Sequence, residues 1–262
     1  MHNSFHIFFK AVLLLVLLII FTFCVPQKKI KYLQKSQSHD TNSFYGNKRT
    51  FDYKIQPKDN LYIRIFSLDE KTFMFFNKQS SGGGYNDLAN DATIYLNSYS
   101  VNNEGYIDFP VVGKVFVKDL TVDQVKNLLQ QSINEYLNEI TVVVKMVNFN
   151  VTFVGEVNRP GQYKIYQDEI TIFEALSMAG DLTDFANRNK VALIRATKDG
   201  SKVFYLDLTS DNILNSQFYY LMPNDIIYIS PLRIKQWGFA VFPYAIVFAA
   251  ISTALLLINY FK

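Results

Sequence analysis

The residue types that most often carry out catalysis are almost missing from the main part of the chain. The three histidines are His2, His6 and His39, and the only cysteine is Cys24. Residues 40–262 therefore offer no Ser–His or Cys–His pair and no histidine- or cysteine-based metal site. The acidic residues are scattered, and no pair of them stands out by its spacing. We expect no enzyme activity, no bound metal and no cofactor.

Cys24 is placed for a different reaction, the covalent attachment of lipid. Lys10 precedes an uncharged, mostly apolar run at 11–23, and a polar stretch follows the cysteine. This order resembles a bacterial lipoprotein signal, with an apolar core in the usual range of about 7–15 residues. The sequence predicts a lipoprotein-type signal peptide at 1–23 and lipidation of Cys24. The alternative is an uncleaved N-terminal helix, because Phe23 stands where a small residue usually precedes the cysteine.

The other end of the chain carries a longer apolar segment. No charged residue lies between Lys235 and Lys262. At about 1.5 Å per residue, this segment easily spans the ~30 Å hydrocarbon layer. Aromatic residues lie near both of its ends, as in the interfacial belts of membrane helices. The sequence predicts a transmembrane helix at 236–261, the alternative being a buried core helix. Residues 24–50, rich in Lys, Gln, Ser and Asn, are predicted to form a tether.

The body between these ends has the composition of a folded protein. A hydrophobic content of 49% with only 19% charged residues excludes a disordered chain. The formal net charge of +3 is too small to indicate binding of nucleic acid. The segment 77–91, which contains three consecutive glycines, lacks the Lys-Ser/Thr of a phosphate-binding loop and is predicted to be a surface loop.

Two stretches of the body share one pattern. The order Tyr-x-(Ile/Leu)-x-Pro-x-Asp-x-(Leu/Ile)-Tyr-Ile occurs at 53–63 and again at 219–229. Proline fixes φ at the start of a turn, and the aspartate side chain can bond to the backbone two residues on. Each copy therefore predicts a strand–turn–strand corner, and we interpret the two copies as related structural units.

Each half of the body also shows a hairpin, a capped helix and a strand. The first hairpin, at 103–117, carries a Glu-Gly turn, and the second, FVGEVNRPGQYKI at 153–165, breaks at Asn-Arg-Pro-Gly. Thr121 with Gln124, and Thr171 with Glu174, fit capping boxes, and Gly180 sits where the second helix would end. Further strands are predicted at 140–147, 190–196 and 203–208. The predicted fold class is α+β, with two small mixed β-sheet modules, each covered by one helix.

These motifs resemble the bacterial outer-membrane polysaccharide export family, the Wza-like translocons. The polysaccharide export domain, predicted at 51–148, is matched at Pro57, Asp59, Gly105, Pro110 and Gly113. The SLBB domain, a β-grasp-like module predicted at 149–232, is matched at Gly155, Arg159, Pro160, Gly161, Glu174 and Gly180.

The resemblance implies a ring-forming component of an outer-membrane translocon that exports capsular polysaccharide or exopolysaccharide. It implies a homo-oligomer whose body lies in the periplasm and which is lipid-anchored in the outer membrane. The implied partners are the polysaccharide substrate and an inner-membrane co-polymerase, often a tyrosine autokinase, with no nucleic acid. The terminal helix of such pores is amphipathic, whereas the segment at 236–261 is almost uniformly apolar. The helix therefore either lines a pore or only anchors the ring.

Two other functions remain open at this point. An inner-membrane polysaccharide chain-length regulator has two transmembrane helices around a periplasmic domain, which fits if residues 5–23 are retained. The body, however, lacks the long helices expected of such a regulator. A membrane-anchored carbohydrate-binding adaptor that forms no channel is the second alternative.

Overall fold

The computed structural model describes residues 27–35, 44–46, 53–76, 91–137, 139–197, 200–233, 235, and eight positions between 245 and 256. The predicted signal peptide 1–23, Cys24 and most of the predicted transmembrane helix 236–261 lie outside the described residues. Among the residues that are described, no helix is both long and apolar enough to cross a membrane.

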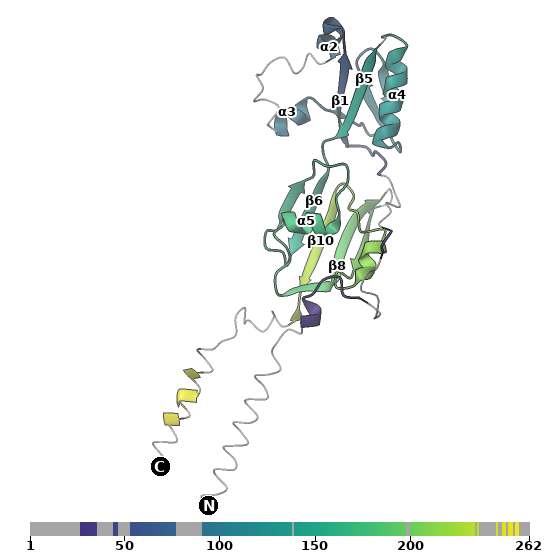
Figure 1. The fold of residues 1–262 in the computed structure, drawn as a ribbon. Helices are drawn as coiled ribbons and strands as arrows, with labels where there is room; N and C mark the ends of the chain where they lie inside the picture. Colours follow the sequence, from purple (N-terminus) through teal and green to yellow (C-terminus); the bar gives the residue numbers. More distant parts are fainter. Residues whose placement is uncertain are drawn as a thin grey trace, which may run out of the picture.

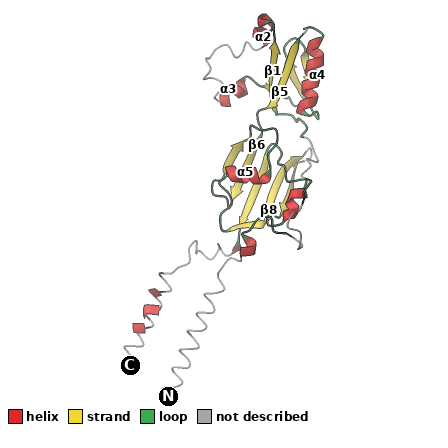
Figure 2. Cartoon of the chain, viewed as in Figure 1, coloured by secondary structure: helices red, strands yellow, loops and turns green. Residues whose placement is uncertain are grey.

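The described body consists of two modules, each with its own β-sheet and hydrophobic core (Figures 1 and 2). The first has an antiparallel sheet of order β2-β1-β5 and a separate hairpin, β3-β4. Helix α4 packs against β5, and short helices α2 and α3 lie near β1. The strands are β1 (Asn60–Ser67), β2 (Tyr99–Ser100), β3 (Tyr106–Phe109), β4 (Gly113–Phe116) and β5 (Ile140–Met146), and the helices are α2 (Glu70–Phe76), α3 (Asp91–Leu96) and α4 (Val122–Asn134).

The second module has a five-stranded mixed sheet of order β7-β6-β10-β8-β9. Only β6 and β10 run parallel, and every other neighbouring pair in this sheet is antiparallel. Helix α5 contributes Ile172, Ala175 and Leu176 to the core beneath this sheet. The strands are β6 (Asn150–Gly155), β7 (Gly161–Lys164), β8 (Ala186–Thr197), β9 (Gly200–Leu206) and β10 (Asp225–Pro231), and the helices are α5 (Ile172–Met178) and the 3₁₀ turns η1 (Gln27–Lys29) and η4 (Asp211–Asn215).

The prediction of two α+β modules that each contain a hairpin, a capped helix and a strand is confirmed. Both helices begin with the predicted capping boxes, at Thr121 with Gln124 and at Thr171 with Glu174. In each box the threonine hydroxyl accepts a hydrogen bond from the third amide of the helix, and the Gln or Glu side chain accepts one from the threonine amide. The predicted strands correspond to β5, β8 and β9.

Four details differ from the sequence-based expectation. The first module's sheet is antiparallel rather than mixed. Its hairpin closes at Pro110–Val112, whereas the predicted Glu104-Gly105 turn leads into β3 from the preceding segment. The run preceding each proline corner is not a named strand, because residues 53–56 and 219–221 make only isolated backbone bonds. Short helices α2 and α3 were not predicted; they border the predicted loop 77–91, of which 77–90 lies outside the described residues.

Residues 27–35, which lie within the predicted tether at 24–50, are attached to the second module. The amides of Leu33 and Gln34 donate to the carbonyls of Leu208 and Thr209, at 3.2 and 2.6 Å. Tyr32 packs edge-on against Phe173 and donates its hydroxyl to Asp181 at 2.5 Å. The polar composition of this segment indicates exposure to solvent, but composition alone cannot predict a few specific contacts such as these.

Gly155, at the end of β6, is fixed by the close approach of β10. Its φ is +95°, and a Cβ placed there would lie 2.0 Å from the Ile229 carbonyl oxygen, a backbone atom that cannot turn away. The next amide, of Glu156, donates to that same oxygen at 2.9 Å. A side chain at position 155 would therefore force the parallel pair β6/β10 apart.

We predict that Gly155→Ala lowers the free energy of unfolding by about 2–4 kcal/mol, because it combines backbone strain with a steric clash. Gly161→Ala is the matched control, since nothing lies within 4 Å of a Cβ at position 161. Urea unfolding of the purified full chain, followed by circular dichroism, measures both variants. Equal midpoints for the two variants would contradict the prediction.

Candidate functional site

The two proline corners form the same turn in both modules. The amide of Asp59 donates to the Gln56 carbonyl, and the amide of Asp225 donates to the Met222 carbonyl, at 3.1 and 3.2 Å. The residue after each proline has a positive φ, +76° at Lys58 and +65° at Asn224. Proline followed by a positive φ is the geometry of a type II turn. The predicted corners are confirmed as turns of one kind.

Each aspartate side chain bonds to the backbone amide three residues before it, and not to the backbone two residues after it as expected. Asp59 Oδ2 accepts the Gln56 amide at 2.8 Å, and Asp225 Oδ2 accepts the Met222 amide at 2.7 Å. Both aspartates are buried. Each carboxylate thus closes its own turn from inside the protein.

The two buried carboxylates have different partners. Asp225 receives two parallel hydrogen bonds from Arg195, at 2.9 and 2.7 Å. Asp59 instead accepts the hydroxyl of Tyr53 at 2.8 Å and the side-chain amide of Asn148 at 3.3 Å. Burial raises the pKa of Asp59, and the hydrogen bonds from Gln56, Tyr53 and Asn148 only partly oppose it. Burial and the charge of Asp59 together raise the pKa of Tyr53, so its hydroxyl stays a donor.

Each corner also fixes the start of the helix in its module. The amide of Ile55 donates to the Leu120 carbonyl at 2.9 Å, and the amide of Leu221 donates to the Ile170 carbonyl at 3.0 Å. Ile55 and Leu221 stand two residues before their prolines, and Leu120 and Ile170 stand one residue before the helix caps. The two modules therefore share a corner, a buried carboxylate and a capped helix in one arrangement.

The corners meet at the linker between the modules. Asn148 accepts the amide of Asn60 at 3.1 Å and donates to the carbonyl of Lys58 at 3.4 Å. On the other side, the amide of Asn224 donates to the carbonyl of Asn150 at 2.8 Å. Met146 packs against both hydrophobic cores. The joint between the two modules is therefore held by hydrogen bonds of the Asn148 side chain, by one backbone bond and by shared packing.

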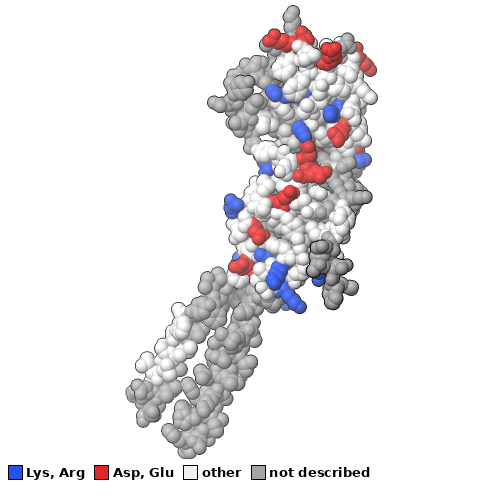
Figure 3. Space-filling view, viewed as in Figure 1, with Lys and Arg blue, Asp and Glu red and all other residues white. Residues whose placement is uncertain are grey.

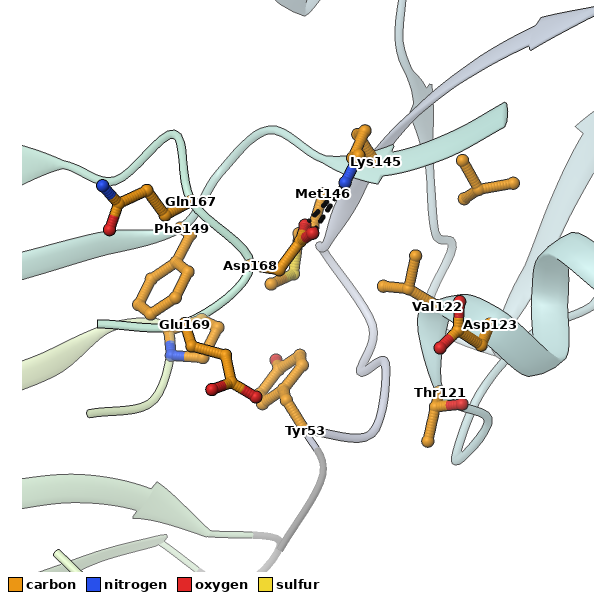
Figure 4. A pocket seen from close by; sticks show the side chains of 12 residues that line it. Tyr53, Thr121, Val122, Asp123, Lys145, Met146, Phe149, Gln167, Asp168 and Glu169 are labelled. Carbon is orange, nitrogen blue, oxygen red and sulfur yellow. Dashed lines mark hydrogen bonds and ion pairs between the residues drawn. The ribbon is translucent and has the colours of Figure 1, made fainter. Parts of the chain in front are cut away.

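A cavity of about 260 Å³ opens at this joint, lined by residues of both modules (Figure 4). The ring of Tyr53 and the side chains of Asp123 and Glu169 lie around it. Lys145 and Asp168 form an ion pair across the joint, at 2.9 and 2.7 Å. The other lining residues are Thr121, Val122, Val144, Met146, Phe149, Gln167 and Pro223.

Of the predicted SLBB motif residues, the turn with Arg159, Pro160 and Gly161 meets Gly180 at the end of α5, whereas Glu174 lies at the start of that helix and Gly155 at the end of β6. The amide of Arg159 donates to the Ala179 carbonyl at 2.9 Å, and the Asn158 side chain donates to the Gly180 carbonyl at 2.7 Å. Gly180 has a φ of +73° just beyond the helix, as a C-terminal cap requires. The turn at 158–161 is therefore attached to the helix, although all four of its residues are exposed.

The export-domain motif residues do not gather at one place. Pro57 and Asp59 lie in the first corner, Gly105 precedes β3, and Pro110 and Gly113 bound the exposed hairpin turn. Gly105 accepts the amides of Val117 and Lys118 and so joins β3 to the end of β4. Their shared role in the structure is to shape turns.

Sequence reasoning missed three charged contacts in the second module. They are the Arg195–Asp225 pair, the Lys235–Glu156 pair at 2.5 Å, and Arg188, which is buried with its guanidinium 5.2 Å from the Tyr32 ring centroid. Burial raises the pKa of Glu156, but hydrogen bonds from Lys235 and Thr183 outweigh this and leave it lowered. Glu156 and Asp225 lie within the sequence patterns at 153–165 and 219–229, but neither pattern indicates a charged partner. Within the described ranges, no group of three or more His, Cys, Asp or Glu residues could hold a metal ion.

We predict that the stability of the Asp59→Asn variant, relative to that of the wild type, increases as pH rises. Because the pKa of Asp59 is raised above 3.8 in the folded state, the folded chain binds more protons than the unfolded chain between these two pKa values. The wild type therefore loses stability as pH increases through that window, and asparagine does not. Urea midpoints at pH 4 and pH 7 test this, with exposed Asp108→Asn as the matched loss of one charge. A stability difference between Asp59→Asn and wild type that is the same at both pH values would contradict it.

Comparisons with known proteins match both modules. Residues 47–147 match the family described as polysaccharide biosynthesis/export protein, and residues 149–229 match the SLBB domain. The chain is 29% identical over 154 residues to the EPS I polysaccharide export outer membrane protein EpsA of Ralstonia solanacearum, covering 57% of this chain and 40% of the relative. The same identity and length are found with the protein of that name from Ralstonia nicotianae, of which 39% is covered. The chain thus spans about two fifths of the length of the curated relatives that it matches. The chain therefore carries a polysaccharide biosynthesis/export domain followed directly by an SLBB domain.

Proposed function

We propose that this protein is a component of an outer-membrane translocon that exports capsular polysaccharide or exopolysaccharide from the periplasm to the cell surface. The observation that carries the proposal is the order of two matched domains along residues 47–229, together with relatives named as polysaccharide export outer membrane proteins. The family is one of transport rather than catalysis, so the mechanism is passage of a hydrated polymer without covalent chemistry.

The proposal includes attachment at both ends of the chain, through lipid on Cys24 and through an apolar helix at 236–261. Support comes from where the described ends lie. Residues 27–35 and Lys235 both attach to the second module, at the end opposite the first module (Figure 1). Exposed basic side chains gather at this end in Figure 3. Lys28, Lys31 and Arg233 are exposed and belong to the segments attached there. We assign this end to the outer membrane, with the two modules reaching into the periplasm.

The proposal also includes assembly of several copies into a ring, served by an inner-membrane co-polymerase such as a tyrosine autokinase. Support for assembly comes from the face of the five-stranded sheet opposite α5. Two cross-strand rows run over β6, β10, β8 and β9 in register, and none of their eight residues is charged. The rows are Thr152, Ile226, Ile194 and Val203, and Val154, Tyr228, Ala192 and Tyr205.

The exposed residues of these two rows are mostly apolar or aromatic, and the Lys190 ammonium lies 4.8 Å from the Tyr205 ring centroid at the edge of the face. Tyr205 is 64% exposed, Val203 52% and Tyr228 42%. With strands about 4.8 Å apart, four strands extend over roughly 19 Å, and contiguous apolar patches of this kind mark interaction sites. We assign the face to contact with a second copy of this chain.

Deletion of the gene in its own bacterium tests the export function. We expect loss of polysaccharide outside the cell and its accumulation inside the envelope, because synthesis continues while exit is blocked. Complementation with the wild-type gene is the control. A chain-length regulator would instead leave polymer at the surface with an altered size distribution, and normal secretion of normal polymer would overturn the proposal.

We predict that Tyr205→Glu combined with Tyr228→Glu reduces the oligomer to smaller species, because it places two charges in the apolar face. Tyr166→Glu, which introduces the same charge at a 79% exposed tyrosine in the loop before α5, should leave the assembly unchanged. Analytical ultracentrifugation of the detergent-extracted full chain measures both. If the double variant sediments like wild type, the face is not the contact between copies.

A further inference from the structure

The cavity at the joint has one rigid aromatic wall. The hydroxyl of Tyr53 is held by the buried carboxylate of Asp59 at 2.8 Å, so the ring cannot turn freely. Figure 4 shows this ring between the side chains of Glu169 and Asp123, which line the cavity with it. Met146 and Phe149 add further apolar lining. An ordered ring presents a negatively polarised face, which attracts the weakly positive C–H groups of a sugar ring.

Six of the other nine lining residues are polar, and three of these six are acidic. Asp123, Asp168 and Glu169 bring three carboxylates to the cavity, and Lys145 is the only cationic side chain among its lining residues. Lys145 is already bonded to both oxygens of Asp168. Carboxylates accept hydrogen bonds from hydroxyl and ammonium groups strongly, and they repel a second anion at close range.

The combination of an aromatic wall with a surplus of acceptors suits a particular class of ligand. The ligand should have C–H groups on one face and hydroxyl or amino donors around its rim, and it should carry no negative charge. The cavity, at about 260 Å³, is smaller than the roughly 300–1,000 Å³ typical of pockets for drug-sized ligands. It therefore suits a single sugar residue rather than a long segment of chain.

We propose that this junction cavity is a saccharide-binding subsite for one neutral or amino-bearing sugar residue, and that it discriminates against uronic acids. The inference rests on the proposed export function, because it identifies the sugar as part of the transported polymer. The subsite lies where the first and second modules meet, so a bound residue contacts both. Tyr53 and Met146 pack against the sugar, while Asp123 and Glu169 accept its donors.

The test compares three tetrasaccharides of similar size on the detergent-solubilised full chain. They are neutral N-acetylglucosamine tetramer, cationic glucosamine tetramer and anionic galacturonic acid tetramer, with binding measured by saturation-transfer NMR and by calorimetry. We expect the neutral and cationic tetramers to bind at least about tenfold more tightly than the anionic one. Binding of the anionic tetramer as tight as that of the neutral one would overturn the inference, and so would binding of none of the three.

Variants that remove charge at exposed positions test whether the binding preference arises at the cavity, and they leave the hydrophobic cores unchanged. Asp123 and Glu169 are exposed, so Asp123→Asn with Glu169→Gln should fold and should reduce the preference over the anionic tetramer to about threefold or less. Asp108→Asn with Glu104→Gln, which removes two charges near the β3–β4 hairpin outside the cavity lining, is the matched control. An unchanged preference in the cavity variant places the binding elsewhere and overturns the assignment.

The export experiment separates this inference from the function on which it rests. If deletion of the gene blocks secretion but the purified chain shows no preference among the tetramers, the subsite is wrong and the export function stands. If deletion leaves secretion normal, the export function fails whatever the chain binds.

Discussion

The carboxylates of Asp59 and Asp225 each accept the backbone amide three residues earlier, and in doing so they hold the two proline corners closed from within the protein. Each corner in turn bonds to the residue that precedes a capped helix, and each reaches the linker between the modules. A buried carboxylate is costly unless its oxygens are bonded, so the corner, the helix start and the linker are stable only together. The cavity, the Tyr53 ring and the relative positions of the two modules all follow from this arrangement.

The two modules use the same parts in a different chain order. In the first, the corner and its strand β1 come before the hairpin and helix, whereas in the second the corner and β10 come after them. In both, the corner strand pairs antiparallel with the strand that follows the helix, β1 with β5 and β10 with β8. The same contacts between corner strand and neighbouring strand thus form in both modules, although the segments that make them occur in a different order along the chain. This order also brings both corners to the linker, because the first begins one module and the second ends the other.

Local chemistry determined what could be predicted from the sequence. Capping boxes, the Gly180 cap and the corners depend on residues within four positions of one another, and these were predicted correctly at Thr121, Thr171 and Pro57. The cavity could not be predicted, because Tyr53, Asp123 and Glu169 are far apart in the sequence and meet only when both corners bind the linker. The attachment of residues 27–35 was missed for the same reason, since Tyr32 finds Asp181 across 149 positions. The hairpin turn was misplaced at Glu104-Gly105 because Pro110 and Gly113 carry equally good turn chemistry.

The position of β10 in its sheet has a mechanical consequence. β10 is a central strand, bonded to β6 on one side and β8 on the other, and the chain leaves it toward Lys235 and the apolar C-terminal segment. A load applied from that end pulls the strand along its own axis, in shear, so that the hydrogen bonds on both sides must break together. An edge strand such as β9 would instead be peeled away one bond at a time. The module is therefore built to resist traction applied along the chain that leaves β10.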